Sequence, residues 1–334
     1  MKPKCVYIGT RQAIGRAYPA AVRQRIEEAA ASVGVVDPCT WTAGDAEILQ
    51  DAEYAFSTWG MPAWSESQIR SLVPKLKALF YAAGSVQTFA RPFLRCGVQV
   101  FSAWGANAVP VAQVTVSEIV LANKGFFQTM HRGGAETWTE RTVGAPYPGN
   151  YHTPVGVIGA GMIGSMVIKM LRRLTLDVRV YDPFLSAERA GLLGAKKVDS
   201  LPALFAECPV VSNHLADKEE TRGLLDRSCF SVMRENGVFL NTGRGRQVVE
   251  ADLVDALRAV PTRAAVLDVT WPEPPEAGSA LYRLPNVFLT PHMAGSIGNE
   301  IGRMGETMAS EFEALLSGQP TRYGVTETQL RTMA

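Results

Sequence analysis

Three spaced glycines directly after an apolar run constrain the fold of this chain more than any other feature. The stretch VGVIGAGMIGSMVIKMLRRL places Gly159, Gly161 and Gly164 between the apolar run Val155–Ile158 and a segment with helical spacing. In a strand–turn–helix unit, the first glycine permits a tight turn, the second lets the backbone approach a pyrophosphate, and the third lets helix and strand pack closely. Glycines also recur by chance, so the strand before and the helix after them carry the prediction of a dinucleotide site.

An acidic residue follows this motif at a meaningful distance. Asp182 lies at the end of the next apolar run, in LDVRVYDPF, 18 residues after Gly164. A carboxylate there accepts hydrogen bonds from the ribose hydroxyls of adenosine and repels the 2′-phosphate of NADP. The alternative is an aspartate that only forms a turn before Pro183. Together with the glycine motif, Asp182 predicts NAD as the cofactor.

Strand-length apolar runs alternate with helical patterns along most of the chain, which predicts parallel sheets covered by helices. A length of 334 residues favours two domains. The first series predicts strands at Val6–Ile8, Tyr54–Ser57, Leu79–Ala82 and Val98–Phe101 and helices at Ala20–Ser32, Glu66–Leu72, Thr88–Arg95 and Val111–His131. The second series predicts strands at Val155–Ile158, Val178–Tyr181, Val210–Asn213, Val238–Asn241, Ala265–Val269 and Val287–Thr290 and helices at Ile163–Leu174 and Glu250–Val260. Ile297–Ser317 is expected to be a helix that returns to the first domain.

One segment interrupts this alternation. Gly133–Pro154 (GGAETWTERTVGAPYPGNYHTP) has no regular pattern and is long for a loop inside a compact domain. Two interpretations remain open, an arm that covers a neighbouring subunit and an exposed excursion.

Composition excludes several classes of function. The formal net charge is +1, which gives no field for gripping nucleic acid or an anionic membrane. The five cysteines are odd in number and form no Cys-x-x-Cys pair, which argues against a disulfide framework and a zinc site. The start of the chain lacks the apolar core of a signal peptide, and no uninterrupted apolar stretch reaches the roughly 18 residues of a membrane span. We therefore expect a cytoplasmic protein without a bound metal.

Polar residues follow four of the predicted strands. Ligands of open parallel sheets bind outside the carboxyl ends of the strands. The residues at those ends are His214, the Thr242-Gly243-Arg244 turn, Asp268 with Glu273, and His292. Two histidines, an arginine and two acids should therefore meet at the edge where the cofactor is expected.

Three of these residues fit one chemistry, hydride transfer to a carbonyl beside a carboxylate. His292 can pass the proton, since imidazole titrates near neutral pH. Arg244 can grip a carboxylate in two-point fashion, and Glu273 can orient the imidazole. Singly, each has an alternative: a loop cap for His292, a surface ion pair for Arg244, a solvated side chain for Glu273. Arg246 competes with Arg244 but lies further into the start of a helix, and the chain's remaining histidines, His131 and His152, lie outside this set.

These motifs resemble the NAD-dependent D-2-hydroxyacid dehydrogenases, over most of the chain. GVIGAGMIG with VYDPF is similar to the cofactor signature of that family, and SNHLADKEETRGLLD to its His-x-Pro-x-Thr-x-x-Thr segment. FLNTGRGRQVVEADLVDAL, LDVTWPEPP and NVFLTPHMAG resemble the segments that bear the catalytic arginine, glutamate and histidine. LFYAAGSVQTF resembles the glycine turn whose N–H groups bind the substrate carboxylate, and VFSAWGANAVPVAQVTVSEIVLA the crossing between domains.

The resemblance implies a fold and a domain plan. A Rossmann-type doubly wound parallel sheet should bind NAD over residues 107–292. A flavodoxin-like α/β domain should bind the substrate over residues 1–106, completed by residues 293–334. It also implies a homodimer, formed through the cofactor domain and its long insertion.

The resemblance also implies site residues. Arg244, Glu273 and His292 would be catalytic, and a small 2-oxo or 2-hydroxy carboxylate would be the substrate, held by Gly84, Ser85, Val86, Arg244 and His292. The implied cofactor contacts are Gly159, Gly161, Met162, Ile163, Gly164, Asp182, His214, Thr242, Gly243, Arg244, Asp268, His292 and Gly295. Asp268 is expected near the nicotinamide carboxamide.

The sequence departs from the family pattern at some positions, and two other functions remain as alternatives. Ala216-Asp217 replaces the usual proline-containing pair after His214, which puts the shape of that loop in doubt, and Gln113 stands where many members have Glu. A cofactor-sensing binding protein of the same fold is one rival. Formate dehydrogenase is another, although enzymes of that group carry Gln rather than Glu at the position of Glu273. The substrate side chain is not readable; Trp64 is expected to pack, and the role of Trp59 stays open.

Overall fold

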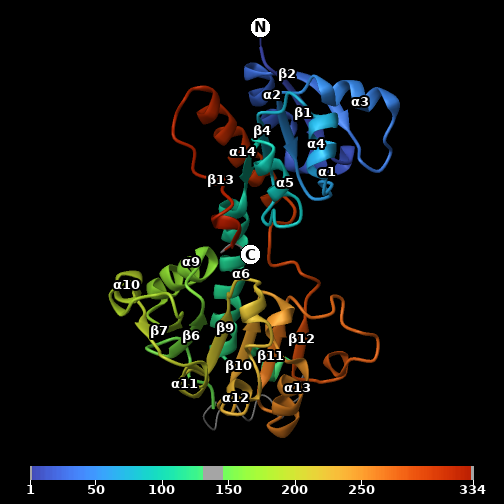
Figure 1. Ribbon diagram of the computed structural model, residues 1–334. Coiled ribbons are helices and arrows are strands. Elements are labelled where there is room, and N and C mark those ends of the chain that lie inside the picture. Colours follow the sequence, from blue (N-terminus) through green and yellow to red (C-terminus); the bar gives the residue numbers. More distant parts are fainter. Residues whose placement is uncertain (1, 131–145, 332–334) are drawn as a thin grey trace. The chain divides into compact units, whose positions relative to one another are not determined.

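The computed structural model describes residues 2–130 and 146–331, and its contacts divide the chain into two units (Figure 1). Unit 1 comprises Met1–Ala108 and Ser296–Ala334, and unit 2 comprises Val109–Gly295. The divisions follow residues 108 and 295, two and three residues after the expected ones at 106 and 292.

Unit 1 is built on a six-stranded sheet. Its order is β13-β5-β4-β3-β1-β2, in which β13 alone is antiparallel to its neighbour. The parallel part therefore reads 2-1-3-4-5, the flavodoxin-like order, and that prediction is confirmed. The strands are β1 (Lys4–Ile8), β2 (Ala31–Val36), β3 (Tyr54–Ser57), β4 (Ala78–Tyr81), β5 (Gln99–Ser102) and β13 (Gly324–Val325).

Helices cover both faces of this sheet. They are α1 (Arg11–Ala17), α2 (Ala20–Ala29), α3 (Ala43–Gln50), α4 (Glu66–Leu72), α5 (Ala90–Arg95) and α14 (Glu300–Leu316). The last helix, α14, packs in unit 1 as expected, and its Phe312 ring lies 5.2 Å from Phe56 and 5.4 Å from Phe80. Buried Glu311 accepts hydrogen bonds from the backbone N–H groups of Arg322 and Tyr323, which fixes the approach to β13.

Unit 2 is built on a seven-stranded parallel sheet with the order β12-β11-β10-β9-β6-β7-β8. Counted from its first strand, this is 3-2-1-4-5-6 with one more strand at the edge, the doubly wound order of dinucleotide-binding domains. The predicted fold class is confirmed. The strands are β6 (Pro154–Ile158), β7 (Asp177–Tyr181), β8 (Lys196–Lys197), β9 (Val210–Asn213), β10 (Val238–Asn241), β11 (Ala264–Leu267) and β12 (Val287–Leu289).

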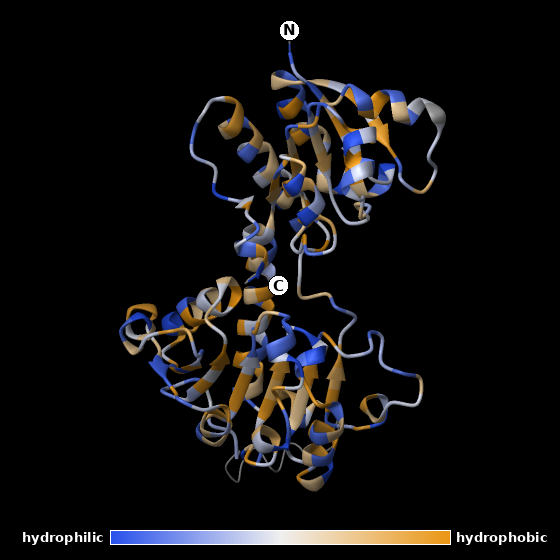
Figure 2. Ribbon diagram, viewed as in Figure 1, coloured by the Kyte–Doolittle hydropathy of each residue, from blue (hydrophilic) through white to orange (hydrophobic). Residues whose placement is uncertain are grey.

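Most strands of both sheets are apolar, whereas the helices mix polar and apolar residues along their length (Figure 2). In unit 2, α6 and α9 pack on one face of the sheet and α11, α12 and α13 on the other. The helices are α6 (Trp104–Asn123), α7 (Phe126–Thr129), α9 (Met162–Leu171), α10 (Ala187–Leu193), α11 (Leu201–Glu207), α12 (Arg227–Phe230) and α13 (Glu250–Ala259). By length and composition alone α6 could cross a membrane; half of it is buried within the protein, as in a core helix.

Several predicted helices are wrong at their ends by two or more residues, and two of them have a clear physical reason. The helix expected over Ala20–Ser32 ends at Ala29, because Ala30 takes an extended conformation and the chain continues as β2 beside β1. The helix expected over Val111–His131 begins earlier, at Trp104, and ends at Asn123, followed at Gly125 by a left-handed turn with φ 71° and then α7. Glycine adopts that conformation without the penalty of a Cβ.

Part of the irregular segment Gly133–Pro154 can now be placed. The Gly149 N–H donates to the Asn123 carbonyl oxygen, and Asn150 Nδ2 donates to that of Val120. Residues 146–154 therefore pack against α6 of their own subunit. Residues 133–145, and His131, lie outside the described residues, so both interpretations of that stretch stay open.

Candidate functional site

The glycine turn of unit 2 has the shape of a phosphate cradle. Gly159 follows β6 with φ 84°, and a Cβ on Gly164 would collide with the Gly159 carbonyl oxygen. A Cβ on Gly161 would meet nothing within 4 Å, so open space lies before the first residues of α9, Met162 and Ile163. Close packing thus requires glycine at 159 and 164, whereas Gly161 borders free space. This arrangement fits a pyrophosphate at the start of the helix.

Asp182 closes one side of this turn. Its Oδ2 accepts from the Ala160 N–H at 2.8 Å and its Oδ1 accepts from the Phe184 N–H at 2.8 Å. The carboxylate is half-buried at the end of β7, as the sequence predicts. Beside it, Lys218 Nζ lies 5.9 Å from the centre of the exposed Phe184 ring. The adenosine end of a dinucleotide would therefore meet one carboxylate and one aromatic ring.

His292 and Glu273 form a direct pair. Nδ1 of His292 lies 2.6 Å from Oε1 of Glu273, and both side chains are partly exposed, at 48% and 40%. This bond leaves Nε2 of His292 free of hydrogen bonds to the residues that the structure describes. The arrangement is that of an imidazole with one nitrogen oriented by a carboxylate and the other available to a substrate.

Asp268 fixes the turn that carries His292. Its Oδ1 accepts from Thr290 Oγ1 at 2.6 Å and from the Met293 N–H at 2.8 Å, and its Oδ2 accepts from the Ala294 N–H at 2.9 Å. His292 itself has φ 52°, in the left-handed region that non-glycine residues seldom adopt. A correction follows: Asp268 comes after β11 rather than within a strand, and its carboxylate is occupied by this turn, which ends near Gly295.

The structure separates the two competing arginines. Arg246 is engaged, with Nη2 3.5 Å from Glu219 Oε2 and its guanidinium 5.3 Å from the centre of the Trp271 ring. Arg244 makes one side-chain bond to a described residue, from Nη1 to the carbonyl oxygen of Gly243 at 2.8 Å. The remaining donors of Arg244 are therefore available to a ligand.

His214 lies at the predicted edge but is buried and internal. Burial lowers the pKa of His214 to about 3, so the imidazole is neutral. Nε2 lies 2.9 Å from Ser212 Oγ, and Nδ1 is buried without a partner among the described residues. The backbone of His214, rather than its side chain, lies next to the glycine turn: its carbonyl oxygen would be 2.9 Å from a Cβ on Gly159.

The glycine turn of unit 1 follows β4. The Ser102 hydroxyl, at the end of β5, donates to the carbonyl oxygens of Ala83 and Gly84 and so holds the turn in place. The N–H groups of Gly84, Ser85 and Val86 donate to no other group in the described parts of the chain. Three free consecutive N–H groups can bind a carboxylate.

Both tryptophans of STWGMPAW belong to unit 1. Trp64 is 7% exposed and packs against Phe93 and Trp41, so the expectation that it packs is confirmed. Trp59 is 46% exposed and follows β3, beside the strand that leads into the Gly84 turn.

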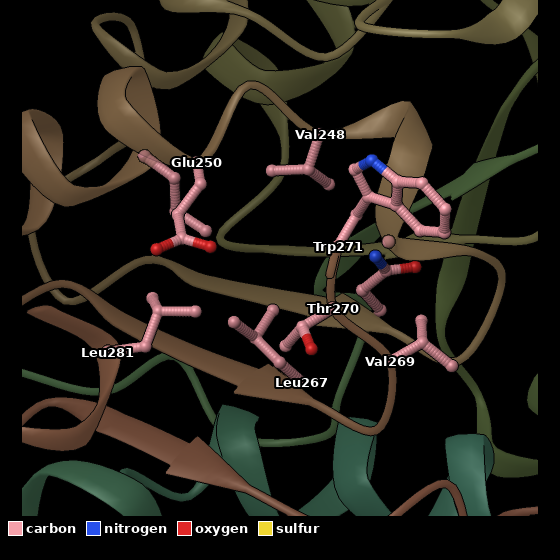
Figure 3. A pocket seen from close by; sticks show the side chains of 10 residues that line it. Val248, Glu250, Leu267, Val269, Thr270, Trp271 and Leu281 are labelled. Atoms are coloured by element: carbon pink, nitrogen blue, oxygen red, sulfur yellow. The ribbon is translucent and has the colours of Figure 1, made fainter. Parts of the chain in front are cut away.

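A small cavity lies beneath the turns after β10 and β11 (Figure 3). Its volume is about 20 Å³, and its lining includes Asn241, Glu250, Thr270 and Trp271. That volume suits about one water molecule and excludes a substrate. This cavity is therefore not a substrate site.

Sequence reasoning missed a group behind the site, on α6. Thr115 Oγ1 lies 3.0 Å from Thr242 Oγ1, which ties α6 to the turn after β10. One turn later, Glu118 faces Asp268; burial, and secondarily the charge of Asp268, raises the pKa of Glu118 to about 7. Its Oε2 is buried without a hydrogen-bond partner among the described residues. The only sequence signal is an acid inside an apolar helix.

This pKa predicts a pH-dependent stability. The folded protein holds the Glu118 proton between the ordinary value of 4.5 and about pH 7. Glu118 therefore lowers the free energy of unfolding as pH rises through this window, by about 3 kcal/mol above it. At about pH 8, Glu118→Gln should unfold at a higher denaturant concentration than wild type. Near pH 4.5 the two proteins should have the same unfolding midpoint. The exposed Glu220→Gln is the control for chemical unfolding at both pH values, and equal midpoints of Glu118→Gln and wild type at pH 8 would contradict the assignment.

Comparisons with known proteins agree with this geometry. Residues 117–294 match the model of the D-isomer specific 2-hydroxyacid dehydrogenase, NAD binding domain. The D-3-phosphoglycerate dehydrogenase of Archaeoglobus fulgidus is 33% identical over 69% of this chain and 43% of its own length. The formate dehydrogenase of Chaetomium thermophilum is 29% identical over 81% of this chain and 76% of its own. The chain spans about half the length of the curated relatives that match it first.

A solved structure extends the likeness to the whole chain. The D-isomer specific 2-hydroxyacid dehydrogenase of Lactobacillus delbrueckii, in its NAD complexed form, aligns with a TM-score of 0.76 at 19% identity. The alignment covers 97% of this chain and 100% of that one, and at this identity it supports the fold alone. The family match spans more than half of the 334 residues and includes the glycine cradle, Arg244, Glu273 and His292. The chain therefore belongs to the family of D-isomer specific 2-hydroxyacid dehydrogenases and carries its NAD-binding domain.

Proposed function

We propose that this protein is an NAD-dependent dehydrogenase that interconverts a 2-oxo acid and a 2-hydroxy acid of the D configuration. The observation that carries the proposal is the 2.6 Å pair of His292 and Glu273 on the cofactor edge of a sheet that also bears the glycine cradle. The cofactor supplies or accepts a hydride at the substrate carbon that bears the oxygen.

The protein's own residues supply binding and the proton. Arg244, with its free donors, grips the substrate carboxylate and polarises the carbonyl. His292 Nε2 gives its proton to the substrate oxygen in reduction and takes it back in oxidation. Glu273 accepts the Nδ1 hydrogen bond at 2.6 Å, which orients the ring toward the substrate oxygen.

A panel of 2-oxo acids tests the proposal. The protein is mixed with NADH and each acid, and the fall in NADH absorbance is followed; turnover of at least one acid is expected. D and L enantiomers of the product, offered with NAD⁺, then test the configuration, and the D form should be oxidised. Tight NADH binding without turnover of any acid would favour a cofactor-sensing binding protein. Oxidation of formate in place of the 2-hydroxy acids would favour assignment as a formate dehydrogenase.

Cofactor choice is a separate prediction, carried by Asp182. A 2′-phosphate beside this carboxylate should cost several kcal/mol, so kcat/KM with NADH should exceed that with NADPH by about 10²-fold or more. Asp182→Ser removes the charge and should narrow the ratio. Initial rates with both cofactors check this, and equal efficiency in the wild type would refute it.

We also infer a homodimer. Large apolar side chains of unit 2 are exposed at the end of α6 and after it, at Leu121, Phe126 and Met130, between 38% and 49%. Light scattering after size-exclusion chromatography should give twice the subunit mass of 36.2 kDa. A mass of one subunit would refute it.

A further inference from the structure

Three side-chain amides form a buried network beneath the turn that carries Arg244. Asn213 ends β9, Asn241 ends β10, and Gln247 follows Arg244 in a short 3₁₀ helix (Gly245–Gln247); each is at most 1% exposed. Asn213 Nδ2 donates to Asn241 Oδ1 at 3.0 Å and to Gln247 Oε1 at 2.6 Å. The network thus joins the carboxyl ends of two neighbouring strands.

Gln247 connects two loops through opposite ends of its amide. Its Oε1 also accepts from the Arg244 N–H at 3.3 Å. Its Nε2 donates to the carbonyl oxygens of Leu215 at 2.9 Å and Ala216 at 3.0 Å. One side chain therefore holds the turn after β10 against the loop after β9.

Asn213 and Asn241 complete the network. Asn241 Oδ1 accepts from the Gly243 N–H at 3.1 Å, and its Nδ2 donates to the Arg244 carbonyl oxygen at 3.3 Å. Asn213 Oδ1 accepts from the Leu215 N–H at 3.2 Å. Each side-chain amide nitrogen and oxygen of the three residues has at least one partner, and a buried network of this kind holds one geometry rigidly.

We propose that Gln247 is a positioning residue, which sets the backbone of Arg244 for the substrate carboxylate and the 215–216 loop for the cofactor. This proposal rests on the proposed function. In the described structure the Arg244 side chain forms no ion pair, and its one hydrogen bond goes to the carbonyl oxygen of the neighbouring Gly243, so its position follows the backbone of this turn. The loop has Ala216 and no proline there, and the two Nε2 bonds of Gln247 supply the restraint.

A matched pair of variants tests the proposal. Gln247→Leu keeps the size of the side chain and removes both ends of the bridge. Gln128→Leu makes the same change at the opposite edge of the sheet, where Nε2 donates to the Asn236 carbonyl oxygen at 3.1 Å before β10. Gln247→Leu should lower kcat/KM for the 2-oxo acid by about 10²-fold through a higher KM and a lower kcat, as misplacement of a gripping group does. Gln128→Leu should keep it within about threefold of wild type.

A second variant separates positioning from folding. In Gln247→Glu the introduced carboxyl keeps an acceptor for Arg244 but faces two carbonyl oxygens, which raises its pKa. Protonated, it can donate to one of them; ionised, it repels both. The ratio of variant to wild-type kcat/KM should therefore rise as pH falls from about 8 to about 6. This readout also decides the matter if Gln247→Leu does not fold.

NADH affinity, measured by fluorescence, keeps this test apart from that of the proposed function. Gln247→Leu should weaken NADH binding severalfold and Gln128→Leu should not. If the wild-type protein reduces no 2-oxo acid, the proposed function is refuted. The comparison of NADH affinities then still decides the role of Gln247. Folded Gln247→Leu with wild-type NADH affinity and kcat/KM, equal losses in both leucine variants, or a pH-independent ratio for Gln247→Glu would each overturn it.

Discussion

His292→Ala is expected to lower kcat/KM for reduction of a 2-oxo acid by about 10³-fold or more, because general acid catalysis contributes about 10²–10⁴-fold. The variant loses the group that gives the substrate oxygen its proton, while the glycine cradle and Asp182 are untouched. NADH should therefore bind with the affinity of the wild type. Stopped-flow absorbance for turnover and fluorescence titration for binding measure the two quantities separately.

His152→Ala is the matched control for this change. His152 is exposed, and its Nδ1 lies 3.4 Å from Asp177 Oδ1, before the amino end of β6, at the edge of the sheet away from Glu273. Its removal should leave turnover unchanged. A His292→Ala variant that keeps more than a tenth of wild-type kcat/KM would mean that another group passes the proton.

Arg244→Lys should lower kcat/KM by about 10²-fold or more. Lysine keeps the charge but loses the planar fork, and a charge-assisted pair of hydrogen bonds contributes roughly 3 kcal/mol. Since the loss concerns the substrate carboxylate, KM for the acid should rise. NADH affinity should change little.

Arg246→Lys provides the comparison for that prediction. Arg246 stacks over Trp271 and lies near Glu219, so its loss should be felt mainly in stability. Steady-state kinetics on both variants decide between the two arginines. A large loss of kcat/KM in Arg246→Lys with none in Arg244→Lys would transfer the role.

Much of the fold could be predicted because strands buried on both faces read as continuous apolar runs. Tyr54–Ser57, Val210–Asn213 and Val238–Asn241 were predicted with the bounds that the structure has. The edge strand β2 was missed. Its sequence ASVGVV is half-exposed and follows a helix directly, so it carries no apolar run of its own.

The candidate site was predictable as a set of strand ends, since topology alone brings those ends to one edge. Its internal supports were not. The anchoring of the His292 turn by Asp268, the Thr115–Thr242 contact and the amide bridge of Gln247 each join segments far apart in the chain. No spacing rule selects such partners, because they depend on how each loop folds back over its strand.

The pairing of Glu273 with His292 is tested most directly by combining Glu273→Gln with His292→Ala. Glutamine keeps the shape of the side chain but replaces the carboxylate that lies 2.6 Å from Nδ1 of His292. Residues that act as one unit lose activity non-additively. Glu273→Gln alone should therefore lower kcat/KM for reduction by about tenfold or more, while the double variant should be no slower than His292→Ala alone. Steady-state kinetics on the three variants measure these losses. Wild-type kcat/KM in Glu273→Gln, or losses that multiply in the double variant, would show that these two residues are not the proton-transfer pair.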